Sequence, residues 1–284
     1  MKIRLLFLCI LVYLSASGQY YYNDIVATQE INFRQKGFSH NSVLRIESRG
    51  FDNKGTLARD FSEMREISKN GHLLKISSFT DLKKSTEYYQ FDDSLRLISF
   101  TDSISLIKNT TNYEYDREGH LIKIQNIVID SVGDFNQVET HHWVYKNGIP
   151  EKMWRIVTNN GAAISTDSLE IRFGVDENGN IVEERSFRNG VQNDFLYYYY
   201  DGNNRMTDIV RYNNKLDKLI PDIMFEYDEN DQVIQKITTT SDRELGYLIW
   251  RYIYNDNGLK VKEALFDNKK QLRGRIDYLY TFTK

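Results

Sequence analysis

Between residues 51 and 284, aromatic and apolar residues alternate with polar ones in short runs that end at turn-forming residues. The fullest example begins with Tyr113 and Tyr115, which are followed by Asp116 and, three residues later, by Gly119. Because side chains alternate between the two faces of a strand, both tyrosine rings lie on one face of a predicted strand. The aspartate can accept a backbone N–H two residues on, and the glycine supplies the left-handed conformation of a tight turn. The pattern therefore predicts a β-hairpin.

This hairpin pattern recurs along the chain. A copy of the Gly119 segment begins at Gly71, and Leu95 lies midway between them, which gives a unit of about 24 residues. Leucine rarely adopts the conformation that the turn requires, so we expect a different turn at Leu95. The other residues predicted to begin or close a turn are Asp92, Asp176, Gly179, Asp201, Asn204, Asp228, Asp231, Asn255 and Gly258. Second turn signals, such as Asn189-Gly190, follow after about ten residues, as in an antiparallel meander.

We predict an all-β fold, in which about nine hairpin repeats with about sixteen strands form a long antiparallel β-meander, arranged as one curled or rolled open sheet. The repeat domain spans residues 51–284. Residues 19–50 do not fit the repeat, and we interpret them as an N-terminal cap with a short helix, begun by Asn23 or Asp24 and ending at Gly37. An open sheet has two edge strands, so we expect self-association through these edges.

Residues 1–18 have the three parts of a cleavable signal peptide: a basic start, an apolar run and small residues ahead of Gln19. The apolar run is too short to cross a bilayer, which needs about twenty residues, so we expect no transmembrane anchor. The only cysteine, Cys9, follows Leu8 inside this run, which argues against a lipoprotein. After cleavage the chain has no cysteine, which excludes disulfides and thiol chemistry. We therefore expect an exported protein that is periplasmic or secreted.

Charge and residue clusters exclude several kinds of function. The 37 basic and 40 acidic residues are interspersed and give a net charge of −3, so the sequence indicates no nucleic-acid partner. His72 and His120 occupy the same turn position in two units, which favours a structural role. His141 and His142 are adjacent on a predicted strand and point to opposite faces, so they cannot share one metal. The aspartates follow the turns and form no glycosidase pair or calcium loop, so we predict no catalytic residue, no metal and no cofactor.

Aromatic residues are unusually frequent, with 20 tyrosines, 15 phenylalanines and three tryptophans. Packing on a buried face accounts for most of them. A strand that contains four consecutive tyrosines must nevertheless present two on each side, which favours an aromatic surface for a sugar or a peptide. The candidates for this surface are Tyr197, Tyr198, Tyr199, Tyr200, Trp143, Trp154 and Trp250.

The tyrosine-aspartate hairpins resemble the YD-repeat family of Rhs-type bacterial proteins, over roughly residues 51–284. The resemblance implies hairpins joined into one winding sheet, which in the large toxins of that family closes as a shell around cargo. This chain is too short for such a shell and carries no recognisable toxin segment. We therefore hypothesise a non-catalytic, exported binding or scaffolding protein with a protein or polysaccharide partner. The alternatives are a carbohydrate-active enzyme with carboxylates that converge on a concave face, and an accessory or immunity partner of a secreted toxin.

Overall fold

The computed structural model describes residues 20–283, apart from 81–82, 105–106, 131–135, 161–163, 214–215, 241 and 243–245. The predicted leader and its cleavage position before Gln19 lie outside these residues. The described residues contain one α-helix, α1 (Asn23–His40), and eighteen strands. The strands are β1 (Val43–Asp52), β2 (Phe61–Ile67), β3 (Leu73–Thr80), β4 (Lys83–Phe91), β5 (Leu97–Ile104), β6 (Ile107–Tyr115), β7 (Leu121–Asp130), β8 (Asn136–Lys146), β9 (Ile149–Asn160), β10 (Ile164–Val175), β11 (Ile181–Arg188), β12 (Val191–Tyr200), β13 (Met206–Asn213), β14 (Lys218–Tyr227), β15 (Val233–Thr239), β16 (Tyr247–Tyr254), β17 (Lys260–Phe266) and β18 (Leu272–Phe282).

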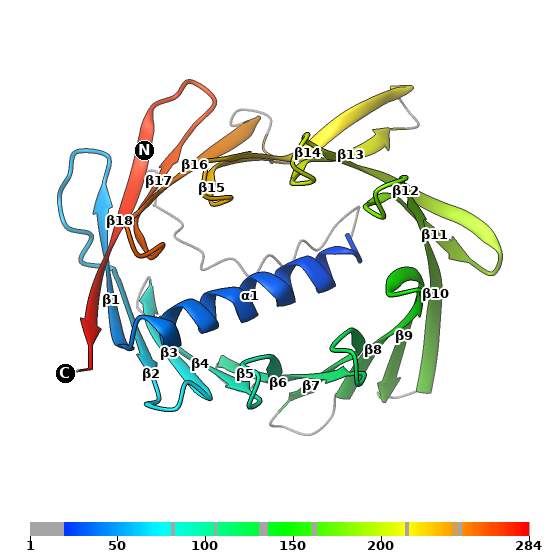
Figure 1. Cartoon of the computed structure of the whole chain (residues 1–284), viewed down its shortest axis with the longest axis horizontal. Coiled ribbons are helices and arrows are strands. Elements are labelled where there is room, and N and C mark those ends of the chain that lie inside the picture. Colours follow the sequence, from blue (N-terminus) through cyan, green and yellow to red (C-terminus); the bar gives the residue numbers. More distant parts are fainter. Residues whose placement is uncertain are drawn as a thin grey trace.

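The strands form one closed barrel. Each strand pairs antiparallel with the next, and β1 also pairs with β18, so that Ile46 of β1 lies between Tyr280 of β18 and Arg65 of β2. Seen end-on, the strands make a complete ring (Figure 1). The predicted open sheet is therefore wrong, although the all-β meander is correct. Closure pairs both edges of the described sheet, which removes the basis for the expected self-association through edge strands.

The strand that closes the ring lies in the segment that the sequence assigns to a cap. β1 spans Val43–Asp52, almost entirely ahead of the first hairpin repeat, and it supplies partners for both β2 and β18. Twist accumulates from strand to strand in a long meander, so its two ends come together. Pairing these ends satisfies backbone N–H and C=O groups that an open edge would leave to water.

Alternate turns of an antiparallel barrel lie at the same end, and most of the predicted turns lie at one end here. In the turn after β6, the Asp116 Oδ1 atom accepts the N–H groups of Glu118 and His120, both at 2.9 Å. Gly119 has a φ of 93°, and its N–H donates to the Asp116 carbonyl oxygen. The same arrangement occurs at Asp92, at Asp176 with Gly179, at Asp201 with Asn204, at Asp228 with Asp231, and at Asn255 with Gly258. We call this end the motif rim, made up of residues 68–72, 92–96, 116–120, 147–148, 176–180, 201–205, 228–232 and 255–259.

Leu95 closes a turn of the same kind as the others. Its φ is 57°, and its N–H donates to the Asp92 carbonyl oxygen at 2.9 Å. The expectation of a different turn is therefore wrong. The left-handed conformation costs a residue with a Cβ atom about 1–2 kcal/mol. The Leu95 side chain packs against Gly71 in the neighbouring turn, which offsets part of that cost.

At six places around the motif rim, a tyrosine near the end of a strand connects neighbouring hairpins. The Tyr115 hydroxyl, at the end of β6, donates to the carbonyl oxygen of Leu97 at the start of β5, at 2.8 Å. Five further tyrosines repeat this contact around the barrel, namely Tyr145, Tyr200, Tyr227, Tyr254 and Tyr280, which donate to Leu121, Ile181, Met206, Val233 and Lys260 respectively. A partly buried tyrosine hydroxyl needs such a partner, so these bonds explain why tyrosine rather than phenylalanine recurs here.

The most deeply buried apolar side chains of the barrel point inward, whereas several ion pairs lie on its outer face. On β1 the inward Ile46 and Ser48 are buried, whereas Glu47 and Arg49, which alternate with them, form an exposed ion pair at 2.7 Å. On β10 and β11 outward ion pairs join Glu170 to Arg172 and Glu183 to Arg185. The most deeply buried apolar side chains are Ile46, Leu74, Leu97, Met153, Ile171 and Ile181.

Helix α1 lies across the inside of the ring, from β11 and β12 at its start to the turn between β2 and β3 at its end (Figure 1). Tyr21, just before the helix, and Ile25 pack with Trp143, and Phe38 packs with Leu97 at the other end. Full burial of such a side chain contributes about 1.5–3 kcal/mol. The helix continues past Gly37 to His40. Among the described residues, no helix is both long enough and apolar enough to cross a membrane.

Candidate functional site

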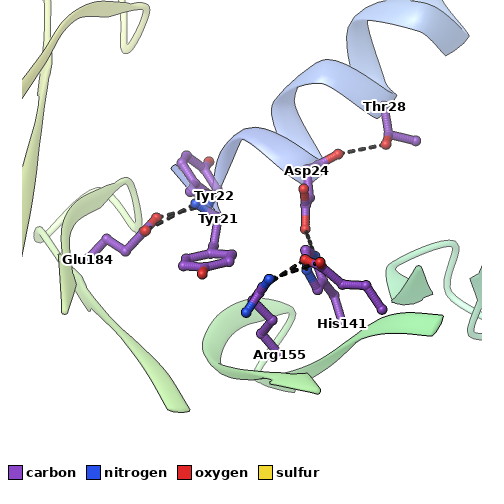
Figure 2. Close-up of polar contacts among 8 residues, drawn as sticks. Tyr21, Tyr22, Asp24, Thr28, His141, Arg155 and Glu184 are labelled. Atoms are coloured by element: carbon purple, nitrogen blue, oxygen red, sulfur yellow. Dashed lines mark hydrogen bonds and ion pairs between the residues drawn. The ribbon is translucent and has the colours of Figure 1, made fainter. Parts of the chain in front are cut away.

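The start of α1 is anchored by a buried carboxylate from the barrel wall. Glu184 of β11 accepts the backbone N–H groups of Tyr21 and Tyr22 at 3.0 and 2.9 Å, as Figure 2 shows. The hydroxyl of Tyr198 on β12 also donates to this carboxylate, at 2.7 Å. Neither Asn23 nor Asp24 caps the helix with its side chain. Glu184 therefore takes the place of a local cap, because a carboxylate at a helix N-terminus satisfies free N–H groups and opposes the positive end of the helix dipole.

Burial dominates the ionisation of Glu184, whose side chain is almost completely covered. It raises the pKa of this carboxyl to about 7, although the bonds from Tyr198, Tyr22 and Tyr21 act in the opposite direction. The negative charge of Asp24 adds to the rise. Glu184 is thus a buried acid that titrates near neutral pH at the point where the helix meets the wall.

A second anchor joins α1 to β8 and β9. His141 Nδ1 lies 2.5 Å from a carboxylate oxygen of Asp24 (Figure 2). Its Nε2 lies 2.9 Å from Glu139. Arg155 donates twice to Glu139, at 2.7 and 2.9 Å. Burial favours the neutral imidazole, but Asp24 and Glu139 outweigh it and raise the pKa of His141 to about 9. Burial likewise opposes the charge of Glu139, but His141 and Arg155 lower its pKa to about 2.

Further contacts anchor the second half of the helix. The N–H of Leu97 donates to the Asn32 side-chain oxygen at 2.7 Å. The buried side chain of Gln35 donates to the carbonyl oxygen of Gly71, in the turn between β2 and β3, also at 2.7 Å. Helix α1 is therefore fixed to opposite sides of the barrel by polar contacts as well as by apolar packing.

One face of α1 is exposed, and the inner wall carries a pair of acidic residues. Phe33 is 77% exposed although α1 lies inside the ring. On the inner wall, Glu87 of β4 lies directly opposite Asp102 of β5, and the Tyr89 hydroxyl donates to Glu87 at 2.8 Å. Burial raises the pKa of Glu87, the bond from Tyr89 lowers it, and the nearby charges of Asp102 and Glu63 add to the rise. The inner wall thus brings two acidic groups together, which the order of the turns does not predict.

The seven predicted surface aromatics do not gather in one place. Tyr197 and Tyr199 lie on the outer face of β12, where the Tyr197 ring is 4.3 Å from Phe195, whereas Tyr198 and Tyr200 point inward. The three tryptophans are also dispersed: Trp143 is buried against Phe173, Trp154 lies outside beneath Lys152, and Trp250 lies on the inner face of β16 opposite Lys236.

Asp116, Glu118 and His120 are the one group of potential metal ligands within the described part of the chain, with ligand atoms within 4.8 Å of one another. Both carboxylate oxygens of Asp116 already accept hydrogen bonds, one from two backbone N–H groups and one from His120. The His120 ring also stacks on Tyr145. The geometry is that of the other turns of the motif rim, so a metal ion adds nothing to its explanation.

Sequence reasoning missed the residues that anchor the helix. The sequence offers His141 only as a possible metal ligand and Asp24 as a local cap, and it does not single out Glu184. The signal available for Glu184 was its place in β11, where it shares the inward face with the buried Ser186. A charged residue on a buried face needs a partner, and here that partner lies in another element.

No protein-family model and no curated protein matches this chain. Among solved structures, a porin-like protein from Bacteroides uniformis ATCC 8492 aligns with 84% of this chain and 98% of its own, at 11% identity and a TM-score of 0.42. The Tc holotoxin pore of Photorhabdus luminescens aligns with 78% of this chain and 16% of its own, at 10% identity and a TM-score of 0.31. The TcdB2-TccC3-Cdc42 structure aligns with 81% of this chain and 19% of its own, at 10% identity and a TM-score of 0.30. With TM-scores below 0.5, these similarities carry no argument about function.

The predicted membership of the YD-repeat family is wrong. The strands close into an 18-stranded barrel instead of an open winding sheet, and no family model matches the chain. The tyrosine-aspartate pattern describes how these hairpins turn, and a short local motif of this kind does not fix the arrangement of the whole sheet.

Proposed function

We propose that this protein is an exported, non-catalytic binding or scaffolding protein that works in the aqueous part of the cell envelope or outside the cell. The leader-like segment at residues 1–18 supports export. The position of helix α1 also supports a scaffolding role. Its contacts with Glu184 and His141 hold it across the interior of the barrel, which a channel would need to keep open.

The observation that carries the proposal is the polarity of the barrel. Outward ion pairs such as Glu47–Arg49 and Glu170–Arg172 lie within the strands. They share the outer face with scattered exposed apolar side chains such as Tyr199, Ile253 and Leu279. In a membrane-spanning barrel the outer face is apolar, and a basic residue facing the lipid near the midplane costs about 2–4 kcal/mol. A charged outer face therefore favours a barrel surrounded by water.

The test is to express the full chain with its own leader and to follow where it goes. We expect the mature protein to begin at Gln19, to leave the cell by osmotic shock or secretion without detergent, and to give no conductance in planar bilayers. The matched control is Leu8→Arg, which interrupts the apolar run and should keep the protein inside the cell. Extraction only by detergent, together with conductance steps, would contradict the proposal.

A carbohydrate-active enzyme is the second candidate, favoured by one observation. Glu87 and Asp102 are cross-strand neighbours on the inner wall, and burial and Asp102 keep the pKa of Glu87 raised. Retaining glycosidases hold two carboxyl groups about 5–5.5 Å apart, and cross-strand neighbours, whose Cβ atoms are about 4.5–5.5 Å apart, can bring their carboxyl groups to such a separation. Hydrolysis of an oligosaccharide that is lost in both Glu87→Gln and Asp102→Asn, but kept in the outward Glu66→Gln, would establish this function in place of the first.

A further inference from the structure

An open groove of about 840 Å³ lies over the first four strands. Ser62, Phe79 and Lys84 lie side by side on its floor across β2, β3 and β4, as the strand register requires. Arg49 of β1 and Arg59, from the segment between β1 and β2, also line it. These residues, together with Arg45, define what we call the basic groove. Its volume falls within the range of about 300–1,000 Å³ that is usual for ligand sites.

Positive charge prevails in the basic groove. Arg49 is paired with Glu47 at 2.7 Å, and the Nε of Arg45 contacts the sulfur of Met64. The groove is therefore lined by four cations and by two acidic residues, Glu47 and Glu63. Two of the cations, Arg59 and Lys84, are exposed and without an ion pair among the described residues, while Glu47 partly offsets the charge of Arg49.

The other lining groups are suited to a sugar chain. Ser62, Ser77 and Thr86 supply hydroxyl groups along the outer face of β2, β3 and β4. Phe79 supplies an aromatic ring between them, against which the apolar face of a pyranose ring can pack. Hydroxyls, one aromatic ring and several cations are together complementary to a polymer that carries both hydroxyl and carboxylate groups.

We propose that the basic groove binds a short stretch of an acidic polysaccharide, with its carboxylates at Arg59 and Lys84 and a sugar ring over Phe79. This inference rests on the proposed export of the protein, since such polymers lie outside the cytoplasm. An open groove on the outer face lets a long chain enter and leave, which a closed cavity does not. Because exposed charges are screened by salt, the affinity depends on ionic strength.

The test is calorimetric titration of the mature full-length protein with a hexamer of galacturonic acid. The uncharged methyl ester of the same hexamer is the matched ligand control. We expect the acid to bind and the ester to bind about tenfold more weakly or not at all, with the affinity for the acid falling as salt is raised. The double variant Arg59→Gln/Lys84→Gln should also bind the acid about tenfold more weakly. The matched protein control is Arg251→Gln/Lys262→Gln, which removes two outward cations on β16 and β17 and should bind like the wild type.

Three results would overturn the inference: no binding of the acid, equal binding of the acid and its ester, or unchanged binding in the Arg59→Gln/Lys84→Gln variant. Binding to phosphatidylglycerol vesicles but not to the hexamer would also overturn it, in favour of a lipid surface. Both substituted residues are exposed, so the variant should keep the wild-type melting temperature; if it does not, the single Arg59→Gln variant serves in its place. Failure here leaves the export test unaffected, because that test measures leader cleavage and location alone.

Discussion

His141 Nδ1 lies 2.5 Å from Asp24 Oδ2, and this contact joins α1 to a barrel strand 117 residues further along the chain. Glu139 occupies the other imidazole nitrogen, so both ring nitrogens act as donors and the imidazole is cationic. His141 is buried, and a buried cation depends on its partners: loss of one partner of such a group costs about 3–5 kcal/mol. The position of the helix is therefore tied to the protonation of one histidine.

The first prediction is that the protein loses stability as the pH rises through about 9. The pKa of His141 is raised from 6.5 to about 9 in the folded protein, so the folded state holds this proton more tightly than the unfolded chain does. Its contribution is complete below pH 6.5 and is lost as the pH rises through 9; it amounts to about 3 kcal/mol. Urea unfolding at pH 6.5, 8 and 9.5 measures it. The free energy of unfolding of the His141→Gln variant should not fall in this way as the pH rises. That of the control variant His142→Gln, whose substituted side chain lies on the outer face, should fall as in the wild type.

The second prediction concerns Glu184. Because burial raises its pKa to about 7, its contribution to stability is present below pH 4.5 and is lost as the pH rises through 7. Glu184→Gln removes this titration, so its free energy of unfolding should change less than that of the wild type between pH 4.5 and 7. The outward neighbour variant, Glu183→Gln, should keep the wild-type slope in that window. Identical slopes for Glu184→Gln and the wild type would show that this carboxyl does not titrate there.

The hairpins could be predicted from the sequence because their chemistry is local. Asp116 accepts a backbone N–H group of the turn, and Gly119 adopts the left-handed conformation that the turn requires. Four consecutive residues are therefore enough to predict the turn. Closure of the barrel could not be predicted in this way. It depends on pairing between residues as distant as Ile46 and Tyr280 and on twist summed over all the strands, and no motif in β1 marks that strand as the partner of β18.

The residues that anchor the helix could not be predicted from the sequence for a similar reason. Alternation along the strand correctly places His141 and His142 on opposite faces, but it does not indicate what each face meets. Glu184 and Tyr21 are 163 residues apart and meet only because α1 crosses the barrel. Periodicity shows which side chains are buried, whereas the partner of a buried charge depends on the path of the whole chain.

The third prediction tests the tyrosine contacts of the motif rim. Tyr115→Phe removes the hydroxyl that donates to the Leu97 carbonyl and leaves that partly buried acceptor without this donor. We expect the free energy of unfolding to fall by about 1 kcal/mol, the usual net value of such a bond. The control is Tyr88→Phe on the outer face, where the side chain is 40% exposed and the change should stay within about 0.5 kcal/mol. Equal effects of the two substitutions would mean that the Tyr115 hydroxyl adds nothing beyond its ring.

The fourth prediction compares two glycines that a Cβ atom should affect in opposite directions. Gly119 has a φ of 93° in a turn of the motif rim, so Gly119→Ala should destabilise the protein by about 1–2 kcal/mol through backbone strain. Gly37 lies within α1, and an added Cβ there meets nothing within 4 Å. Gly37→Ala should therefore stabilise the protein by up to about 1 kcal/mol, the difference in helix propensity between the two residues. Urea unfolding of both variants at pH 6.5 measures the pair. If Gly119→Ala is as stable as the wild type, the turn does not depend on a left-handed residue; if Gly37→Ala is destabilised, the helix meets the wall more closely there than its contacts indicate.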